Sequence, residues 1–192
     1  MIGEEEDAFL REHSRVFLLG TRADGSPTGW PMVGLYPGGA LDRLNWGADK
    51  VAGLGSRTIR VALPGNIYLV NTPEAKTLAQ MAATPAYDKL FTDARFRTYL
   101  LTAYSLSEMG NLWADGFTAA EYQATRQEIA ELGDYLLTNP RLAGKTFIIL
   151  NWEADNAIAK FANKQSIWDA FTAWIQARAD GIHEAQLRNP RS

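Results

Sequence analysis

An apolar run at residues 146–150 ends abruptly in side chains that could do acid–base chemistry. The polar and aromatic residues that follow it are Asn151, Trp152, Glu153 and Asp155. In barrel enzymes of the α/β class, catalytic groups stand in this way at the carboxyl end of a buried parallel strand. A carboxyl group packed beside an indole can act as a general acid, because burial raises its pKa. The pattern therefore makes Glu153 the candidate catalytic acid/base, or alternatively a carboxylate that holds an arginine or a backbone NH.

The neighbours of Glu153 are candidates for binding a substrate. Asn151 lies two positions earlier, so in a regular strand of a barrel both side chains can face the barrel axis. Asn151 would then orient a substrate hydroxyl or cap a neighbouring loop. Asp155 lies two positions later, roughly 6–7 Å along an extended strand. That distance approaches the separation of inverting carboxylate pairs, about 6.5–9.5 Å; the other interpretation of Asp155 is a loop cap or an arginine partner.

Other side chains near the expected strand ends could contact a substrate. Three tryptophans could stack on a sugar ring or pack locally: Trp30, Trp113 and Trp152. Three more have helical apolar spacing and are expected in the core: Trp46, Trp168 and Trp174. Tyr104 and Ser105 end a predicted strand and are candidates for hydrogen bonding. The two histidines, His13 and His183, lie away from strand ends, so neither a histidine base nor a histidine metal site is expected.

The elements that would position these groups alternate along the chain. Strands are predicted at residues 15–21, 57–63, 98–105 and 145–152. Helices are predicted at residues 4–13, 41–54, from 73 onward with a break at Thr84–Pro85, 118–137 and 166–187. Residues 22–39 are rich in Gly and Pro and are expected to form a loop. Thr118 and Glu121 have the spacing of a capping box.

Apolar strands that alternate with amphipathic helices indicate a parallel sheet with helical crossovers. The expected fold class is α/β, a parallel (β/α)n repeat of about four units, in a single (partial) barrel domain over residues 1–192. Four units correspond to half of a TIM barrel; the alternatives are two copies that pair or a small three-layer sandwich. In a barrel, Arg60 would point to the interior and pair with Glu153 or Asp155. It would then hold substrate and tune Glu153, or form a purely structural ion pair.

Composition excludes several functional classes. The 192 residues have a net charge of −3 and no basic stripe, so no nucleic-acid partner is expected. The chain has no cysteine, which excludes disulfides and thiol chemistry. No apolar run is long enough to span a membrane, and the acidic first residues are unlike a signal peptide, so we expect a cytoplasmic protein. No dinucleotide or P-loop motif is present, and no cofactor is expected.

Two short sequence motifs follow one another in the last third of the chain. They comprise Phe147, Ile148, Asn151, Trp152, Glu153 and Asp155, followed by Trp174, Arg178, Asp180 and Gly181. This order resembles (β/α)8-barrel proteins of the glycoside-hydrolase type, where a strand ends Phe-Ile-Leu-x-Asn-Trp-Glu-Gly-Asp and the next helix carries Trp-x-x-x-Arg-x-Asp-Gly. The resemblance extends through residues 56–60, 84–87 and 113–116, and so covers most of the chain.

The resemblance implies a carbohydrate-active hydrolase with Glu153 as acid/base at the end of the fourth strand. In clan A glycoside hydrolases that glutamate directly follows an asparagine, whereas here Trp152 separates Asn151 from Glu153. The resemblance also implies a nucleophile on a seventh strand, beyond the four units counted here. The expected ligand is a sugar or oligosaccharide. The alternative is a non-catalytic carbohydrate-binding or structural half-barrel that acts as a homodimer.

Overall fold

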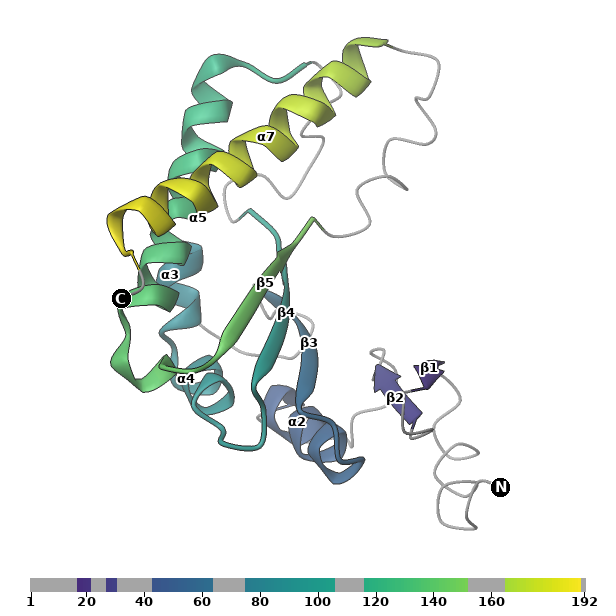
Figure 1. Cartoon of the computed structure of the whole chain (residues 1–192). Coiled ribbons are helices and arrows are strands. Elements are labelled where there is room, and N and C mark those ends of the chain that lie inside the picture. The colour runs from purple at the N-terminus through teal and green to yellow at the C-terminus, as the bar shows by residue number, and fades with distance from the viewer. Residues whose placement is uncertain are drawn as a thin grey trace.

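The computed structural model describes residues 17–21, 27–30, 43–63, 75–105, 116–151 and 165–190 (Figure 1). Its centre is a parallel sheet with strand order β3-β4-β5. The strands are β3 (Thr58–Leu63), β4 (Thr98–Ala103) and β5 (Thr146–Leu150). These three strands and their parallel pairing agree with the expectation from the sequence.

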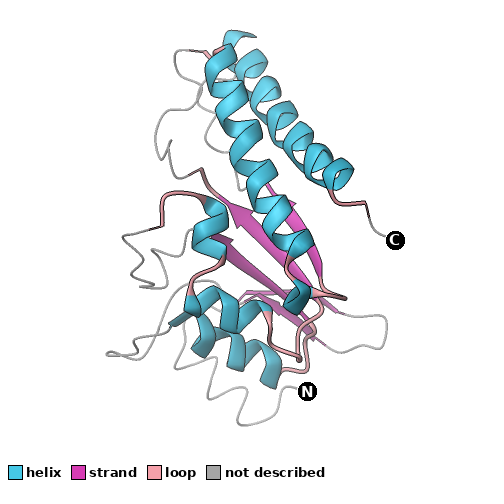
Figure 2. Cartoon of the chain, turned by 90° about the vertical axis from the view of Figure 1, so that its left-hand side faces the viewer, coloured by secondary structure: helices cyan, strands magenta, loops and turns pink. Residues whose placement is uncertain are grey.

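The two crossovers between these strands are helical. Helices α3 (Leu78–Ala82) and α4 (Pro85–Phe91) join β3 to β4, and α5 (Ala119–Thr138) with the short 3-10 helix η2 (Pro140–Leu142) joins β4 to β5. Figure 2 views the molecule from the helix side, with the strands behind the helices. Since the strands follow one another in chain order, both crossovers lie on the same face of the sheet, as in consecutive units of a (β/α) repeat.

The core lies between this face and the helices. Alternate strand residues are buried there: Ile59, Val61, Leu63, Tyr99, Leu101 and Ala103. Tyr99 stacks on Phe147 with ring centroids 4.9 Å apart, and its hydroxyl donates to the carbonyls of Leu90 and Phe91. Helix α2 (Arg43–Gly53) adds Leu44, Ala48 and Val51 to the same cluster.

The opposite face of the sheet is more polar and more open. Arg60, Leu100 and Ile148 are aligned across the three strands. Arg60 is exposed. Ile148 is 44% exposed, which is high for an isoleucine in a sheet. The helices therefore cover one face of the sheet, while a mixed row of side chains lies on the other.

The helices begin and end at local sequence signals, and some of these boundaries were predicted. The break between α3 and α4 is at Pro85, as expected, because proline removes a backbone donor. The helix starts at Leu78 instead of residue 73, since the side chain of Thr77 accepts a hydrogen bond from the backbone NH of Gln80. The capping box of Thr118 and Glu121 is present at the start of α5. Gly55, with φ of 76°, follows the end of α2.

Helix α7 (Gln165–Arg188) packs along α5 through very small side chains. A Cβ on Gly181 would meet the carbonyl oxygen of Arg126 at 2.4 Å, and one on Gly133 would meet Ala185 Cβ at 2.6 Å. Glycine is therefore required at both contacts for the helices to approach this closely. In Figure 1, α7 runs past the carboxyl ends of β4 and β5.

The first predicted strand does not join the parallel sheet, and this corrects the count of four units. β1 (Phe17–Thr21) pairs antiparallel with β2 (Pro27–Trp30) in a separate two-stranded sheet. Residues 27–30 were expected in a loop. Only a short connection separates the two strands, which permits antiparallel pairing and excludes a helical crossover. The described residues thus contain three parallel strands, not four.

Two further findings concern predicted core positions and the membrane. Trp174 is buried as predicted, but Trp168 is 38% exposed, so its assignment to the core was wrong. It lies on the outer side of α7 beside Phe171. Among the described helices, none is both long and apolar enough to cross a bilayer.

Candidate functional site

The carboxyl ends of β4 and β5 meet a buried arginine from α7. Nε of Arg178 donates to Oδ1 of Asn151 at 2.7 Å. Its Nη2 donates to the carbonyl oxygens of Ala103 and Leu150, each at 3.1 Å. Arg178 is only 3% exposed. One side chain on the last helix therefore holds the ends of two neighbouring strands.

The surroundings of Arg178 are mostly neutral. Its guanidinium lies 4.7 Å from the ring centroid of Trp174, a cation–π distance. Burial lowers the pKa of Arg178 to about 10, while the negative charge of Glu128 acts in the opposite direction. No carboxylate within the described ranges forms an ion pair with Arg178. The group stays protonated at neutral pH, so a positive charge is buried at the strand ends.

Two more groups complete this edge of the sheet. The Ser105 hydroxyl donates to Oε2 of Glu128 at 2.6 Å, which links the segment after β4 to α5. The backbone NH of Tyr104 donates to the carbonyl of Leu63 at 2.7 Å, and the Tyr104 side chain packs half-buried against the core. This edge therefore combines one guanidinium, one amide, one hydroxyl and one carboxylate.

The structure separates the predicted site residues into three groups. Asn151, Tyr104 and Ser105 lie at the strand-end site, and Asn151 is directed toward α7 and Arg178. Arg60 lies on the other face of the sheet, where its Nε donates to Oγ1 of Thr102 at 3.1 Å. The remaining predicted residues, Trp113, Trp152, Glu153 and Asp155, lie outside the described residues, as does the side chain of Trp30.

The orientation of Asn151 differs from the one expected. It shares the parity of Phe147 and Ile149, whose side chains pack against the helix-side core. Arg60 is in register with Ile148, which has the opposite parity. The two residues that were both expected to face a barrel interior are thus directed to different sides of the sheet.

Arg178 is the functional candidate that the sequence reasoning did not assign a role. It belongs to the second motif, at residues 174–181. It follows Trp174 by one helical turn and lies among the buried residues of α7. A charged residue at a position that helical spacing places in the core is the signal that could have identified it, because such a group needs specific partners.

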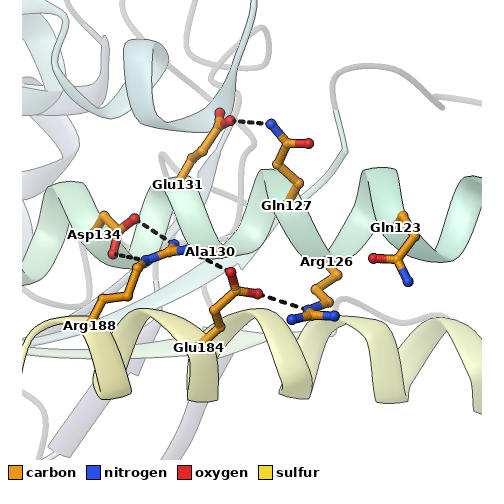
Figure 3. Close-up of a pocket in the computed structure, with 8 residues that line it drawn as sticks. All are labelled: Gln123, Arg126, Gln127, Ala130, Glu131, Asp134, Glu184 and Arg188. Atoms are coloured by element: carbon orange, nitrogen blue, oxygen red, sulfur yellow. Dashed lines mark hydrogen bonds and ion pairs between the residues drawn. The ribbon is translucent and has the colours of Figure 1, made fainter.

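A groove between α5 and α7 is a second candidate, but its charges are already paired (Figure 3). It has a volume of about 410 Å³. Glu184 accepts from Arg126 at 2.8 Å and from Arg188 at 2.5 Å, and Arg188 also donates to Asp134 at 2.6 Å. These pairs satisfy one another across the helix interface, which favours a structural role for the groove.

Another groove, of about 580 Å³, lies beside Lys145 at the amino end of β5. The ammonium of Lys145 donates to the carbonyls of Asp93 and Phe96, each at 2.6 Å, so it joins the start of β5 to the turn between α4 and β4. Ligands of parallel sheets bind at the opposite, carboxyl edge. The edge with Arg178 is therefore the stronger candidate.

The described part of the chain contains no group of three or more metal-ligating side chains. Comparison of the sequence and structure with protein-family models, curated proteins and solved structures gives no match. The candidate site is therefore defined by its own geometry: a buried guanidinium that holds Asn151 at the carboxyl edge of a parallel sheet.

Proposed function

We propose that this chain is a carbohydrate-active protein of the glycoside-hydrolase type, with its ligand site at the carboxyl edge of β3, β4 and β5. The observation that carries the proposal is the hydrogen bond from Arg178 to Asn151. It fixes the residue two positions before Glu153 at the edge where parallel α/β sheets bind ligands. The one-sided crossovers are a second support, since consecutive barrel units share this arrangement.

In this proposal Glu153 is the general acid/base. A protonated carboxyl group donates its proton to the glycosidic oxygen as the bond between that oxygen and the anomeric carbon breaks. Water supplies the hydroxyl that ends on the anomeric carbon and the proton that restores the carboxyl group. General acid–base catalysis of this kind contributes about 10²–10⁴-fold to rate. Asn151 acts through its position: its carbonyl oxygen is engaged by Arg178, so its amide NH₂ group is the part that remains to bind a sugar oxygen.

The test is hydrolysis of a panel of aryl glycosides by the wild type and by Glu153→Gln. We expect Glu153→Gln to lose at least 100-fold in kcat/KM. Asp169→Asn is the matched control, since it removes an exposed carboxylate of α7 that is not a candidate site residue, and it should retain most of the activity. Equal activity of Glu153→Gln and the wild type contradicts the role of Glu153. A wild type that hydrolyses none of the glycosides contradicts the catalytic proposal.

A second candidate is a non-catalytic half-barrel that binds carbohydrate as a dimer. It is favoured by the face of the sheet that the described helices do not cover, where Ile148 is 44% exposed on an outer strand of the described sheet. Light scattering after size exclusion tests it: we expect a dimer for the wild type and a monomer for Ile148→Lys. Gln123→Lys, at an exposed position of α5 on the helix side of the sheet, is a control for added charge.

A further inference from the structure

The two outer strands of the described sheet, β3 and β5, differ in how their outer edges are satisfied. In β3, the alternate residues Thr58, Arg60 and Ala62 direct their backbone groups away from β4. The Ser56 hydroxyl accepts from the NH of Thr58 and donates to its carbonyl. The Tyr87 hydroxyl donates to the carbonyl of Ala62 at 2.6 Å, and Arg60 adds an exposed charge. Charges and covered backbone groups prevent an edge from pairing with another strand, so the β3 edge is closed.

The outer edge of β5 has neither feature. The NH of Thr146 donates to the carbonyl of Arg97 beside β4, so the alternate residues Phe147 and Ile149 direct their backbone groups outward. No described residue forms a hydrogen bond with these outward groups. The five residues of β5 include no charge, no proline and no bulge. The β5 edge is therefore open to pairing with another strand.

The side chains of β5 are also less covered than those of the neighbouring strand. Tyr99 and Leu101 of β4 are fully buried on the helix side. Phe147 and Ile149, their partners in register on β5, are only half-buried. On the other face, Ile148 is 44% exposed. A strand added beside β5 covers both rows at once, and burial of these apolar side chains favours its addition.

We propose that two copies of the chain pair through β5, antiparallel and about a two-fold axis at Ile148, to form one continuous sheet. In this register Phe147 lies opposite the partner's Ile149, and Ile149 lies opposite the partner's Phe147. Because these residues carry the outward backbone groups, each of the two pairs exchanges both NH···O hydrogen bonds. Ile148 lies opposite the partner's Ile148 on the face that the described helices leave open. No like charges oppose one another, since the five residues of β5 are uncharged.

A second copy fits this edge because the register is self-complementary. Each outward donor meets an acceptor, and each half-covered row of side chains meets an equal row. A two-fold contact uses the same edge of both copies, so it closes after one pairing. The closed β3 edge stops further growth of the sheet, and a dimer is expected. Antiparallel pairing does not complete a parallel barrel and needs no sugar, so this dimer does not depend on either proposed function.

A single introduced thiol tests the register directly. The chain has no cysteine, so such a thiol can form a disulfide only between copies. In the proposed dimer the Cα atoms of the two Ile148 residues lie about 4.5 Å apart, as a non-hydrogen-bonded pair. A disulfide needs about 4.4–6.8 Å. Thr146 lies opposite the partner's Leu150, so the two Thr146 Cα atoms are more than about 13 Å apart. Ile148→Cys is therefore the test, and Thr146→Cys, exposed on the same face of the same strand, is the matched control.

Both variants are oxidised in a glutathione buffer at micromolar protein concentration and separated by non-reducing electrophoresis. We expect Ile148→Cys to form the disulfide dimer at least about tenfold faster than Thr146→Cys, because pairing raises the effective concentration of the two thiols. Light scattering of the wild type over a rising concentration series should show a dimer. Thermal unfolding checks that both variants are folded.

Three outcomes overturn the inference. Equal rates of disulfide formation in the two variants, or a faster rate for Thr146→Cys, contradict the register. A wild type that remains monomeric, or that forms larger oligomers in place of a dimer, contradicts the two-fold pairing. A dimer that Ile148→Lys dissociates but that Ile148→Cys does not link contradicts pairing at the β5 edge, and it leaves the dimer of the second candidate function standing.

Discussion

Nε of Arg178 donates a hydrogen bond of 2.7 Å to Oδ1 of Asn151, across 27 positions of sequence. The bond joins the end of β5 to the middle of α7. It therefore connects the two motifs, one at residues 147–155 and one at residues 174–181, that the sequence analysis identified. Because the same guanidinium also holds the carbonyl at the end of β4, the position of the strand ends depends on the packing of α7 on α5. Four predictions test these contacts and others in the same core and helix pair.

Arg178→Met should destabilise the protein by about 3 kcal/mol, because one buried and two half-buried acceptors lose a charged donor. Arg95→Met is the matched control: Arg95 is half-exposed, and its pairs with Asp93 and Asp49 lie at the surface, so a much smaller loss of stability is expected. Urea unfolding at pH 7 measures both. Equal losses for the two variants would show that burial of Arg178 does not matter.

Gly181→Ala should destabilise the protein by about 2 kcal/mol, because the new methyl group meets the Arg126 carbonyl and α7 must move away from α5. Gly53→Ala, at the end of α2 with nothing within 4 Å, should be neutral or roughly 0.5 kcal/mol more stable. Thermal unfolding compares them. A neutral Gly181→Ala protein would contradict the close helix contact.

Tyr99 should make the protein sensitive to alkaline pH. Burial raises the pKa of its hydroxyl well above the ordinary value of 10.0. The unfolded chain therefore releases the proton first, so stability falls as pH rises above about 10 and continues to fall until the folded pKa is passed. Urea midpoints from pH 8 to 11 should decline less steeply for Tyr99→Phe. Absorbance at alkaline pH should show fewer tyrosines ionising in the folded wild type than in the unfolded chain, and this difference should be smaller for Tyr99→Phe.

Asp180 should contribute to stability above pH 4 and lose this contribution in acid. The hydroxyl of Tyr122 donates to its carboxylate and lowers its pKa below the ordinary value of 3.8; Gln176 and the charge of Arg126 act in the same direction. A lowered folded pKa means that stability falls as pH drops from the unfolded pKa through the folded one. Asp180→Asn should reduce the loss between pH 5 and 2.5. An identical acid profile would contradict the bond to Tyr122.

Local signals predicted most of the secondary structure. The apolar runs at β3, β4 and β5, the helical spacing of α2 and α7, the break at Pro85 and the capping box at Thr118 all depend on residues within a turn or two of one another. Near-continuous apolar strands that alternate with helices also predicted parallel pairing. The start of α3 was missed because the cap of Thr77 depends on one short side chain.

The errors arose where pairing or packing between distant segments decides the outcome. The run at β1 has the same composition as a parallel strand, yet β2 pairs with it first because the connection is short. Asp24-Gly25, a dipeptide typical of hairpin turns, was the signal in the sequence. The direction of the Asn151 side chain depends on its hydrogen bond to Arg178 of α7. The spacing of residues within β5 carries no information about that contact.

By itself the sequence determined most of the strands and helices, their alternation from β3 onward, and the polar groups that follow the strand at residues 146–150. These properties reside in neighbouring residues and in the period of their hydrophobicity. Only the tertiary structure decided that Arg178 meets Asn151 and that Arg60 lies on the other face. Hydrogen bonds between distant segments need a specific distance and direction, which composition and period do not encode.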